Sequence, residues 1–489
     1  MGVVEGFLTI SRHRTAIKRT DFSRPIRLAL EHGLIGETTT VFDYGCGHGD
    51  DVDRLREMGV AAEGWDPVYC PLTNPQVSDV VNLGYVLNVI EDEGERAAAL
   101  RAAWNLAGKL LVVSARLNIE ASAFRHQSEY GDGFLTSRST FQKLYEQNEL
   151  RQWINTLLGV SSVPAAPGIF YIFRDQAAHE SFVASRYRRV MMLPRAERTP
   201  AGFEQHRDLL DKLAAFLSER GRLPGEFESA FVADIRREIG SLNRAFALLR
   251  RATGDEQWKR ISELRSQDLL IYLALSRISK RPRFSELPES IRLDVKAFFS
   301  TYSRACQAAD ELLFSAGKRD LIQQACRTSP VGKLTADALY VHTSALQHLP
   351  PVLRVYEGCA RGYIGVVDGA NIVKLHRHKP QVSYLQYPKF EKDPHPALAA
   401  SLKIPLDTFH IDYREYSKST NPFILHRKET MLAPDHPLKP KFASLTAKEE
   451  ELGLYESPEL IGTREGWQRI LDKKGVYFSG QRLVRKRSA

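Results

Sequence analysis

Three glycines stand at alternate positions in the stretch VFDYGCGHGDD, residues 41–51, directly after an apolar pair and an acidic residue. Glycine lets the backbone turn sharply and approach a ligand closely, although it costs conformational entropy. Asp43 ends this apolar run, and Asp66 ends the next one, AAEGWDP. A carboxylate at the end of the second strand of such a unit can accept hydrogen bonds from the hydroxyls of a ribose. The pattern predicts a site for a cofactor that contains a nucleoside.

The residues after the glycines distinguish two classes of cofactor. A dinucleotide site has the spacing GxGxxG, which brings a pyrophosphate to the start of a helix. Here the third glycine follows as GxGxG, and Asp50, Asp51 and Asp53 come next. These carboxylates would repel a pyrophosphate, whereas they would not repel a ligand that carries a sulfonium and an ammonium group. The stretch therefore favours S-adenosylmethionine over a dinucleotide.

The elements that must position these residues alternate between strands and helices up to about residue 175. Short apolar segments predict strands at TTVFDYG, AAEGWDP, SDVVNLGY, KLLVVSARL and PGIFYIFRD. Helical patterns lie between them at DDVDRLREMG and EDEGERAAALRAAWNLAG, each closed by a glycine, and at STFQKLYEQNELRQWINTLL, with Ser139 or Thr140 as its cap. Strand–helix alternation predicts an α/β fold with a parallel sheet covered on both faces.

The character of the chain changes twice after this region. Apolar residues at helical spacing predict a helical domain over residues 195–330, with the helical pattern continuing to about residue 317. Glycine and β-branched residues return after residue 333, where VDGAN predicts a hairpin turn between two strands. We therefore expect three domains: 1–180 with a basic N-terminal segment, 195–330, and an α+β domain at 333–489 with a basic tail.

The strand, the aspartate and the GCGxG sequence together resemble the first motif of class I S-adenosylmethionine-dependent methyltransferases. The resemblance implies a Rossmann-like domain in which Gly45, Gly47 and Gly49 approach the methionine and ribose portions of the cofactor, with Cys46 as a small structural residue of the loop. It also implies that Asp43 orders the loop or meets the ammonium group. The other implied cofactor residues are Asp66 for the ribose and Trp65 or Pro67 near the adenine.

Longer segments resemble one subfamily more closely. These are RHRTAIKRTDFSRPIRLALEHGLI, DVVNLGYVLNVIED and IVKLHRHKPQVSYLQYPKF, on either side of the glycine motif and the helical middle. In this order they resemble the methyltransferase family associated with bacterial DNA phosphorothioation systems, over most of the chain. The resemblance implies a methyltransferase of DNA sulfur modification and defence, with DNA and the proteins of such a system as partners.

The methyl acceptor would lie beyond the strand that ends in Asn82, Leu83, Gly84 and Tyr85. Enzymes that methylate amino groups of nucleic acids place Asn or Asp, two prolines and an aromatic residue there. Asn82 and Tyr85 fit the outer positions, and the prolines are missing. These two residues are the acceptor-side candidates, while methylation of an exocyclic amine is in doubt. In the alternative interpretation both residues have structural roles: Asn82 caps a loop and Tyr85 packs.

Nucleic-acid contact is predicted for three segments in which cations could meet phosphates, with rings that could stack on bases in the second. The third of them is the basic tail, with Arg482, Arg485, Lys486 and Arg487. The N-terminal segment supplies Arg12, Arg14, Lys18 and Arg19. The second segment supplies Lys374, His376, Arg377, His378 and Lys379, with Tyr384 and Tyr387 as the rings. The alternative for this second segment is an ordinary solvated strand edge. The pair His376 and His378 lacks a fixed third ligand, so no metal site is predicted.

Composition limits the remaining choices. The 489 residues are 43% hydrophobic and 26% charged with a net charge of +9, which favours polyanionic partners. Five scattered cysteines without a CxxC pair indicate a reducing, cytoplasmic location. No apolar run is long enough to cross a membrane. Two alternatives to a DNA methyltransferase stay open: a tRNA methyltransferase, and a non-catalytic protein that binds S-adenosylmethionine or nucleic acid and assists a phosphorothioation system.

Overall fold

The structure is a computed structural model that describes residues 10–124, 127–194 and 202–485. The chain divides into two compact units, of which the first comprises Met1–His179 with Arg361–Asp368 and the second Glu180–Ala360 with Gly369–Ala489. The predicted helical and C-terminal domains both fall within the second unit. Lys486 and Arg487 of the predicted basic tail lie outside the described residues.

The first unit is built on a sheet of six strands in the order β2-β1-β3-β4-β9-β8. Strands β1 to β4 pair in parallel, while β9 runs antiparallel to both β4 and β8. This is a Rossmann-like mixed sheet, and it agrees with the predicted α/β class. The strands are β1 (Thr40–Tyr44), β2 (Ala61–Trp65), β3 (Ser78–Gly84), β4 (Ala107–Ser114), β8 (Val163–Ala166) and β9 (Ile169–Phe173).

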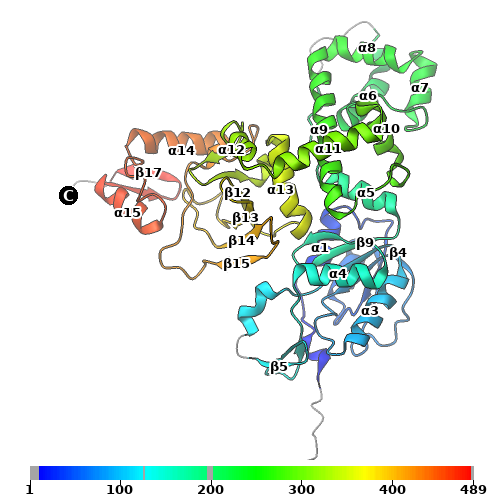
Figure 1. Ribbon diagram of the computed structural model, residues 1–489, viewed down its shortest axis with the longest axis vertical. Helices are drawn as coiled ribbons and strands as arrows, with labels where there is room; N and C mark the ends of the chain where they lie inside the picture. The colour runs from blue at the N-terminus through cyan, green and yellow to red at the C-terminus, as the bar shows by residue number, and fades with distance from the viewer. Residues whose placement is uncertain (1–9, 125–126, 195–201, 486–489) are drawn as a thin grey trace, which may run out of the picture. The chain divides into compact units, whose positions relative to one another are not determined.

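Helices cover both faces of this sheet because successive side chains of a strand point to opposite faces. On one face, Val81 of β3 packs in a core with Leu100 of α3 and Leu150 of α4. On the other face, the hydroxyl of Tyr171 lies 3.0 Å from the ring of His32, directly after α1. The helices are α1 (Arg24–Glu31), α2 (Asp50–Glu57), α3 (Glu93–Leu106), α4 (Gln147–Leu158) and α5 (Gln176–Ser185) (Figure 1).

Two boundaries in this unit differ from those expected. Helix α4 begins at Gln147, and its N-cap is Glu146 in a capping box with Glu149. The predicted cap at Ser139 or Thr140 is therefore wrong, because residues 141–142 are drawn into a small sheet whose strands are β5 (Ser128–Tyr130), β6 (Gly133–Leu135) and β7 (Phe141–Gln142). Helix α3 ends in Leu106 and runs directly into β4, so no glycine closes it. Strand β8 was not predicted.

A segment from far along the chain completes this unit. Residues Arg361–Asp368 pack with the first unit rather than with their sequence neighbours. The amide of Val366 donates to the carbonyl oxygen of Ala165 at 2.8 Å, and the carboxylate of Asp368 lies 2.5 Å from the guanidinium of Arg24. No local pattern in the sequence indicates this packing.

The second unit begins with helices that share one apolar core. Its cluster includes Leu210, Leu213, Ile235 and Leu249, at the helical spacing seen in the sequence. The helical pattern continues to about residue 317 as expected, in two helices that are separated at Ser300, which has φ +62°. The helices are α6 (Arg207–Arg220), α7 (Phe231–Glu238), α8 (Leu242–Thr253), α9 (Asp255–Ser279), α10 (Glu289–Phe299), α11 (Tyr302–Ala316) and α12 (Arg319–Arg327).

The rest of the second unit is an antiparallel sheet in the order β10-β11-β12-β13-β14-β15, with a separate hairpin near the C-terminus. Helix α13 (Pro351–Ile364) precedes β12, so VDGAN joins a helix to a strand, and the hairpin predicted there is wrong. The elements are β10 (Lys333–Leu334), β11 (Ala338–His342), β12 (Ala370–His376), β13 (Gln381–Gln386), β14 (Ala400–Pro405), β15 (Asp412–Glu415), α14 (Lys439–Glu451), α15 (Arg464–Lys473), β16 (Val476–Ser479) and β17 (Arg482–Arg485).

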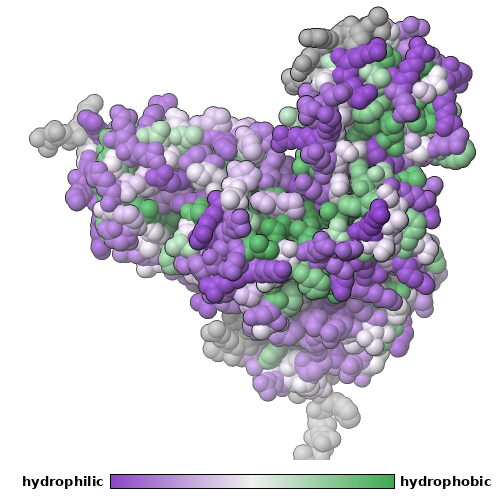
Figure 2. All heavy atoms as spheres, turned by 45° about the horizontal axis from the view of Figure 1, so that its top comes forward, coloured by the Kyte–Doolittle hydropathy of each residue, from purple (hydrophilic) through white to green (hydrophobic). Residues whose placement is uncertain are grey.

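The surface is mostly hydrophilic, as expected for a chain in which 26% of the residues are charged. On the side drawn in Figure 2, hydrophilic side chains cover most of the described surface and apolar ones form small groups. Among the described residues, none of the helices combines the length and the apolar character that crossing a bilayer requires.

Candidate functional site

A cavity of about 960 Å³ lies at the carboxyl ends of the parallel strands of the first unit. Its walls include residues 45–47 after β1, 65–68 after β2 and 84–86 after β3. The strand order changes direction at β1, because β2 lies on one side of it and β3 on the other. Open α/β sheets bind ligands in the crevice at this switch point. The volume is at the upper end of the range for small-molecule sites, about 300–1,000 Å³.

The glycine turn after β1 requires glycine for two separate reasons. Gly45, Gly47 and Gly49 have φ values of +89°, +56° and +84°, a region that other residues rarely adopt. A Cβ on Gly45 would also lie 2.4 Å from Cγ2 of Val86, whereas one on Gly49 would meet nothing within 4 Å. Gly45, Cys46 and Gly47 line the cavity, while Gly49 is the N-cap of α2.

The amide groups of this turn are already hydrogen-bonded within the chain. The amides of Gly45 and Cys46 donate to the carbonyl oxygen of Trp65, and that of Gly49 donates to Cys46. The amide of Gly47 donates to Oδ2 of Asp66 at 3.2 Å. A phosphate site at a strand–helix turn needs free amides, and these four are already used within the chain.

Asp66 is held at the end of β2 with its carboxylate in the wall of the cavity. Its Oδ1 accepts from the amides of Val68 and Tyr69, both at 2.9 Å. A carboxylate oxygen can accept more than one hydrogen bond, so this group keeps acceptor capacity for a ligand. Trp65 and Pro67 line the same cavity. The structure thus brings the predicted ribose and adenine residues together with the glycine turn.

Asp43 and Asn82 lie side by side beneath the turn, on neighbouring strands whose register pairs them. Asn82 is 2% exposed, and its amide donates to Oδ1 of Asp43 at 2.8 Å. Neither residue is in the cavity wall. The acceptor-side prediction for Asn82 is therefore corrected, because its side chain is used in holding Asp43.

Tyr85 does line the cavity, and its backbone is unusual. It has φ +60°, and its amide donates to both the carbonyl and the hydroxyl oxygen of Ser114, at 3.0 and 3.1 Å. An aromatic residue in this conformation is strained by about 1–3 kcal/mol and occurs mainly at functional sites. Of the two acceptor-side candidates, only Tyr85 reaches the space that a substrate would occupy.

The N-terminal strap, residues 10–23, forms one wall of this cavity. Its Arg12 guanidinium donates two hydrogen bonds at 2.8 Å to Glu91 and reaches Glu95 as well. These two carboxylates raise the pKa of Arg12. Arg12 was predicted to contact nucleic acid, but its charge is already paired with these carboxylates. Arg14 and Lys18 are exposed.

The strap also covers the start of α2. The amide of Arg19 donates to Asp50 and the amide of Ser23 donates to Asp51, both at 2.7 Å. Two of the carboxylates that were expected to repel a pyrophosphate, Asp50 and Asp51, thus accept hydrogen bonds from the backbone of the strap. Arg19 lines the cavity together with Ile10, Arg12, His13, Thr15, Ala16 and Ile17. The sequence did not reveal this arrangement, because the strap contacts residues distant along the chain.

Comparisons with known proteins give only weak matches to solved structures, over about a third of the chain. Neither protein-family models nor curated protein sequences match the chain. Solved structures similar to it include a magnesium protoporphyrin IX methyltransferase from Synechocystis PCC 6803 with bound SAH (14% identity, 34% of this chain, 93% of that chain, TM-score 0.23). Another is a 1,6-didemethyltoxoflavin-N1-methyltransferase from Burkholderia thailandensis with S-adenosylhomocysteine (14% identity, 34% and 76%, TM-score 0.21). With TM-scores this low, we argue from the geometry of the cavity.

The second segment predicted to bind nucleic acid lies in the second unit and is largely buried. Strands β12 and β13 are central in their sheet, and Tyr384 and Tyr387 are 5% and 4% exposed. The hydroxyl of Tyr384 donates to Glu357 of α13 at 3.1 Å, and Tyr387 belongs to the core on the other face. These rings cannot stack on bases. The prediction for both tyrosines is wrong, because helices and loops cover both faces of the sheet.

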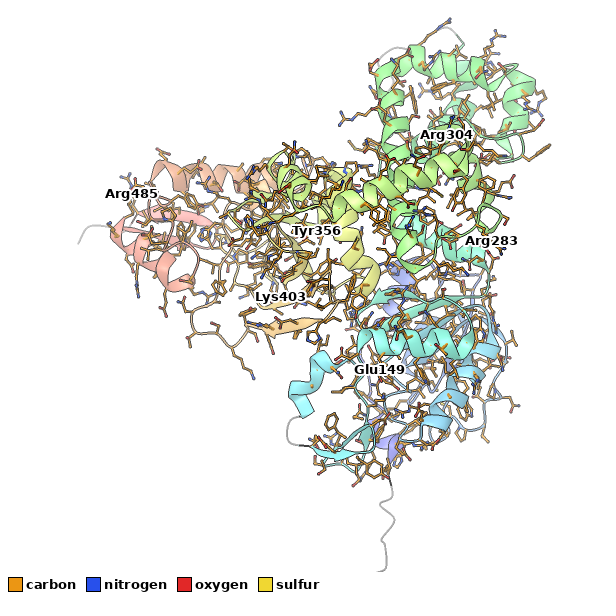
Figure 3. The ribbon with its side chains drawn as sticks, in the orientation of Figure 1. Glu149, Arg283, Arg304, Tyr356, Lys403 and Arg485 are labelled. Atoms are coloured by element: carbon orange, nitrogen blue, oxygen red, sulfur yellow. The ribbon has the colours of Figure 1, made fainter. Side chains whose placement is uncertain are left out.

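Only some of the basic residues of that segment are exposed and could contact a ligand. His376 and Arg377 are buried: the His376 ring lies 3.0 Å from the Ser383 hydroxyl, and Arg377 donates to the carbonyl of Thr335 at 2.8 Å. Tyr356 on α13, labelled in Figure 3, places its hydroxyl 3.0 Å from the carbonyl oxygen of Lys379. Lys374 is half-buried, and the side chains of His378 and Lys379 are exposed. The continuous basic and aromatic surface that was predicted does not form.

The pKa of Asp43 gives a prediction for stability. Burial raises this pKa from 3.8 to about 7, the nearby Asp51 carboxylate adds to the rise, and the hydrogen bond from Asn82 opposes it. The folded state therefore binds more protons than the unfolded state between these two values. Stability is lost as pH rises through this range. At ~1.4 kcal/mol per pKa unit, the loss has an upper limit of about 4 kcal/mol.

We expect Asp43→Asn to remove this loss while its amide oxygen still accepts from Asn82. Relative to wild type, the melting temperature of the variant should rise steadily between about pH 5 and about pH 8. Thermal unfolding across that range measures it. Asp53→Asn, on an exposed side chain of α2 (71% exposed), is the control and should show no such trend. If the difference in melting temperature between wild type and Asp43→Asn does not change with pH, the pKa of Asp43 is not raised.

Proposed function

We propose that the first unit binds S-adenosylmethionine in this cavity and transfers its methyl group to an acceptor that enters beside Tyr85. The observation that carries the proposal is the position of Asp66: its carboxylate lines the same cavity as the glycine turn, one strand away at the carboxyl edge of the sheet. A ribose held there would direct the methionine portion toward residues 45–47.

The chain's own groups fit this ligand better than a dinucleotide. The amides of Gly45, Cys46, Gly47 and Gly49 are used within the chain, and the start of α2 is acidic and covered by the strap. Both features disfavour a pyrophosphate and accept a cationic ligand. Trp65, Pro67 and Val68 supply an apolar wall beside Asp66 for a base.

When bound, S-adenosylmethionine supplies a methyl group activated for attack by a nucleophile. The protein then has to hold that nucleophile in line and keep bulk water away. The strap lines the cavity beside the glycine turn, where a Cβ on Gly47 would lie 3.2 Å from Cβ of Ala16, and Tyr85 lines it just after β3. Burial raises the pKa of the Tyr85 hydroxyl, which is therefore protonated at neutral pH and can donate a hydrogen bond to an acceptor.

For the acceptor we propose nucleic acid, with DNA first, in the context of a phosphorothioation system. The resemblance of the long sequence segments and the net charge of +9 support this choice. Of the residues predicted to contact nucleic acid, Arg14, Lys18, His378 and Lys379 are exposed and could contact phosphates. tRNA is the second acceptor to test. The burial of Asn82 is the observation that favours the alternative, a protein that binds the cofactor without transferring its methyl group.

Two measurements on the full chain test the proposal. Calorimetry should show saturable binding of S-adenosylmethionine and S-adenosylhomocysteine, and tritium from labelled cofactor should then appear in DNA, tRNA or protein. Binding with transfer to DNA is the expected result. Absence of cofactor binding overturns the proposal, and binding without transfer to any acceptor leaves only the non-catalytic alternative.

A further inference from the structure

The acceptor side of the cavity contains an unusual group of charges around Tyr85. Arg19, Arg24 and Arg116 line the cavity, and the carboxylates that line it with them are those of Asp66, Glu91, Glu95 and Glu120. Burial raises the pKa of the Tyr85 hydroxyl; the charges of Arg24, Arg19 and Arg116 oppose this rise, and that of Glu120 adds to it. The cations come from three separate parts of the first unit: the strap, the start of α1 and the loop after β4.

Two of these guanidinium groups have partners that fix their positions. Arg24 lies 2.5 Å from Asp368, and it donates to the carbonyl oxygen of Pro167 at 3.3 Å. Arg116 lies 3.9 Å from Glu120. A guanidinium has five N–H donors, and the two contacts named for Arg24 use its Nε and one of its Nη atoms.

Arg19 is held differently, through its backbone. Its amide donates to Asp50 and its carbonyl oxygen accepts from Arg54 at 2.8 Å, so the strap is tied down on both sides of the residue. The Arg19 guanidinium acts on the Asp43 carboxylate and on Tyr85. Because these backbone bonds do not use the side chain, Arg19 can be replaced without releasing the strap.

Resting on the proposed function, we propose that Arg19, Arg24 and Arg116 bind an oxyanion of the methyl acceptor, a phosphate or a carboxylate, and thereby hold its nucleophilic atom beside Tyr85. Planar guanidinium groups recognise both anions through paired hydrogen bonds. The carboxylate of the cofactor's methionine portion could occupy one guanidinium. Three of them around a single tyrosine exceed what that carboxylate needs.

The strain at Tyr85 supports an acceptor subsite here. Its left-handed backbone, fixed by two hydrogen bonds to Ser114, keeps the residue in the cavity wall among these cations. Strain of this kind persists only where the surrounding structure imposes it. Tyr85 thus acts as a positioning residue at the edge of the anion site.

The test uses the full chain saturated with S-adenosylhomocysteine, so that the cofactor's own carboxylate is in place. Calorimetric titrations with inorganic phosphate, acetate and a short single-stranded oligodeoxynucleotide measure anion binding. We expect Arg19→Glu to weaken binding of the anion that wild type prefers by about 10-fold or more, the usual effect of losing one charged hydrogen-bond partner. Arg116→Gln should weaken it in the same direction. Arg14→Glu is the matched control, because Arg14 is an exposed cation of the strap outside the cavity wall, and it should leave the binding of free phosphate or acetate unchanged.

The outcomes separate this inference from the function on which it rests. Wild-type protein that binds no S-adenosylhomocysteine overturns the proposed function itself. If cofactor binding is normal and Arg19→Glu weakens only the anion, the inference is supported, and the preferred probe tells a nucleic-acid phosphate from a small free anion. If Arg19→Glu and Arg116→Gln both weaken cofactor binding while anion binding is unchanged, the guanidinium groups serve the cofactor and the inference is wrong.

Discussion

Replacing Asp66 with alanine is expected to lower the affinity for S-adenosylmethionine about 100-fold or more. The carboxylate would lose hydrogen bonds to two ribose hydroxyls, and bonds to a charged group contribute about 1.5–3 kcal/mol each, so two of them correspond to at least about 3 kcal/mol. Asp66 also accepts from the amides of Gly47, Val68 and Tyr69, so the turn after β2 loosens as well. Calorimetry with the cofactor measures the change.

Two further variants separate ligand contact from loop support. Asp66→Asn keeps an oxygen for the amides of Val68 and Tyr69 and loses the charge. Its affinity for S-adenosylmethionine should therefore lie between those of wild type and Asp66→Ala. Asp53→Ala removes an exposed carboxylate of the same motif, 71% exposed, and should bind like wild type. If Asp66→Ala keeps its circular dichroism spectrum and its affinity, the cofactor does not lie in this cavity.

The parts of the site that the sequence predicted depend on short-range patterns. Asp43 and Asp66 each mark the end of an apolar run, and such runs became β1 and β2 with their carboxyl ends at one edge. Parallel pairing then brings the turn and the carboxylate together without further information. For this reason Gly45, Gly47 and Asp66 could be assigned from residue types and spacing alone.

The parts that were missed depend on contacts between distant residues. Arg12 binds Glu91, which is 79 positions away, and no local pattern distinguishes such a pair from free surface charge. The same limit explains Tyr384: alternation along β13 shows that its side chains point to two faces, but not that α13 and a second core cover both. A basic and aromatic stretch was therefore taken for a surface when it is the centre of a sheet.

Because the strap is bound to the start of α2, the basic residues near the N-terminus have a different role from the one predicted. Had Arg12 and Arg19 been free, they would have been ordinary phosphate contacts outside the site. Because Asp50 and Asp51 hold the strap's backbone, these arginines become part of the cavity itself. Part of the positive charge that suggested a polyanionic partner therefore lines the cavity itself.

Gly45→Ala is expected to destabilise the first unit by about 2–5 kcal/mol. A left-handed backbone costs a non-glycine residue about 1–2 kcal/mol, and overpacking costs about 1–3 kcal/mol more, because the new Cβ would lie 2.4 Å from Cγ2 of Val86. Gly49→Ala is the matched control: its φ is +84°, but a Cβ there meets nothing within 4 Å. It should show only the backbone cost. Urea unfolding of the three proteins gives the comparison.

The double variant Gly45→Ala with Val86→Ala tests the cause of the larger loss. Removing the Val86 methyl groups relieves the contact and leaves the backbone strain, so the combined loss should be smaller than the sum of the two single losses. Coupling between contacting residues is about 0.5–3 kcal/mol. Losses that simply add would mean that the turn after β1 and the loop after β3 do not touch. In that case the close approach that closes the cavity between Gly45 and Val86 would not exist.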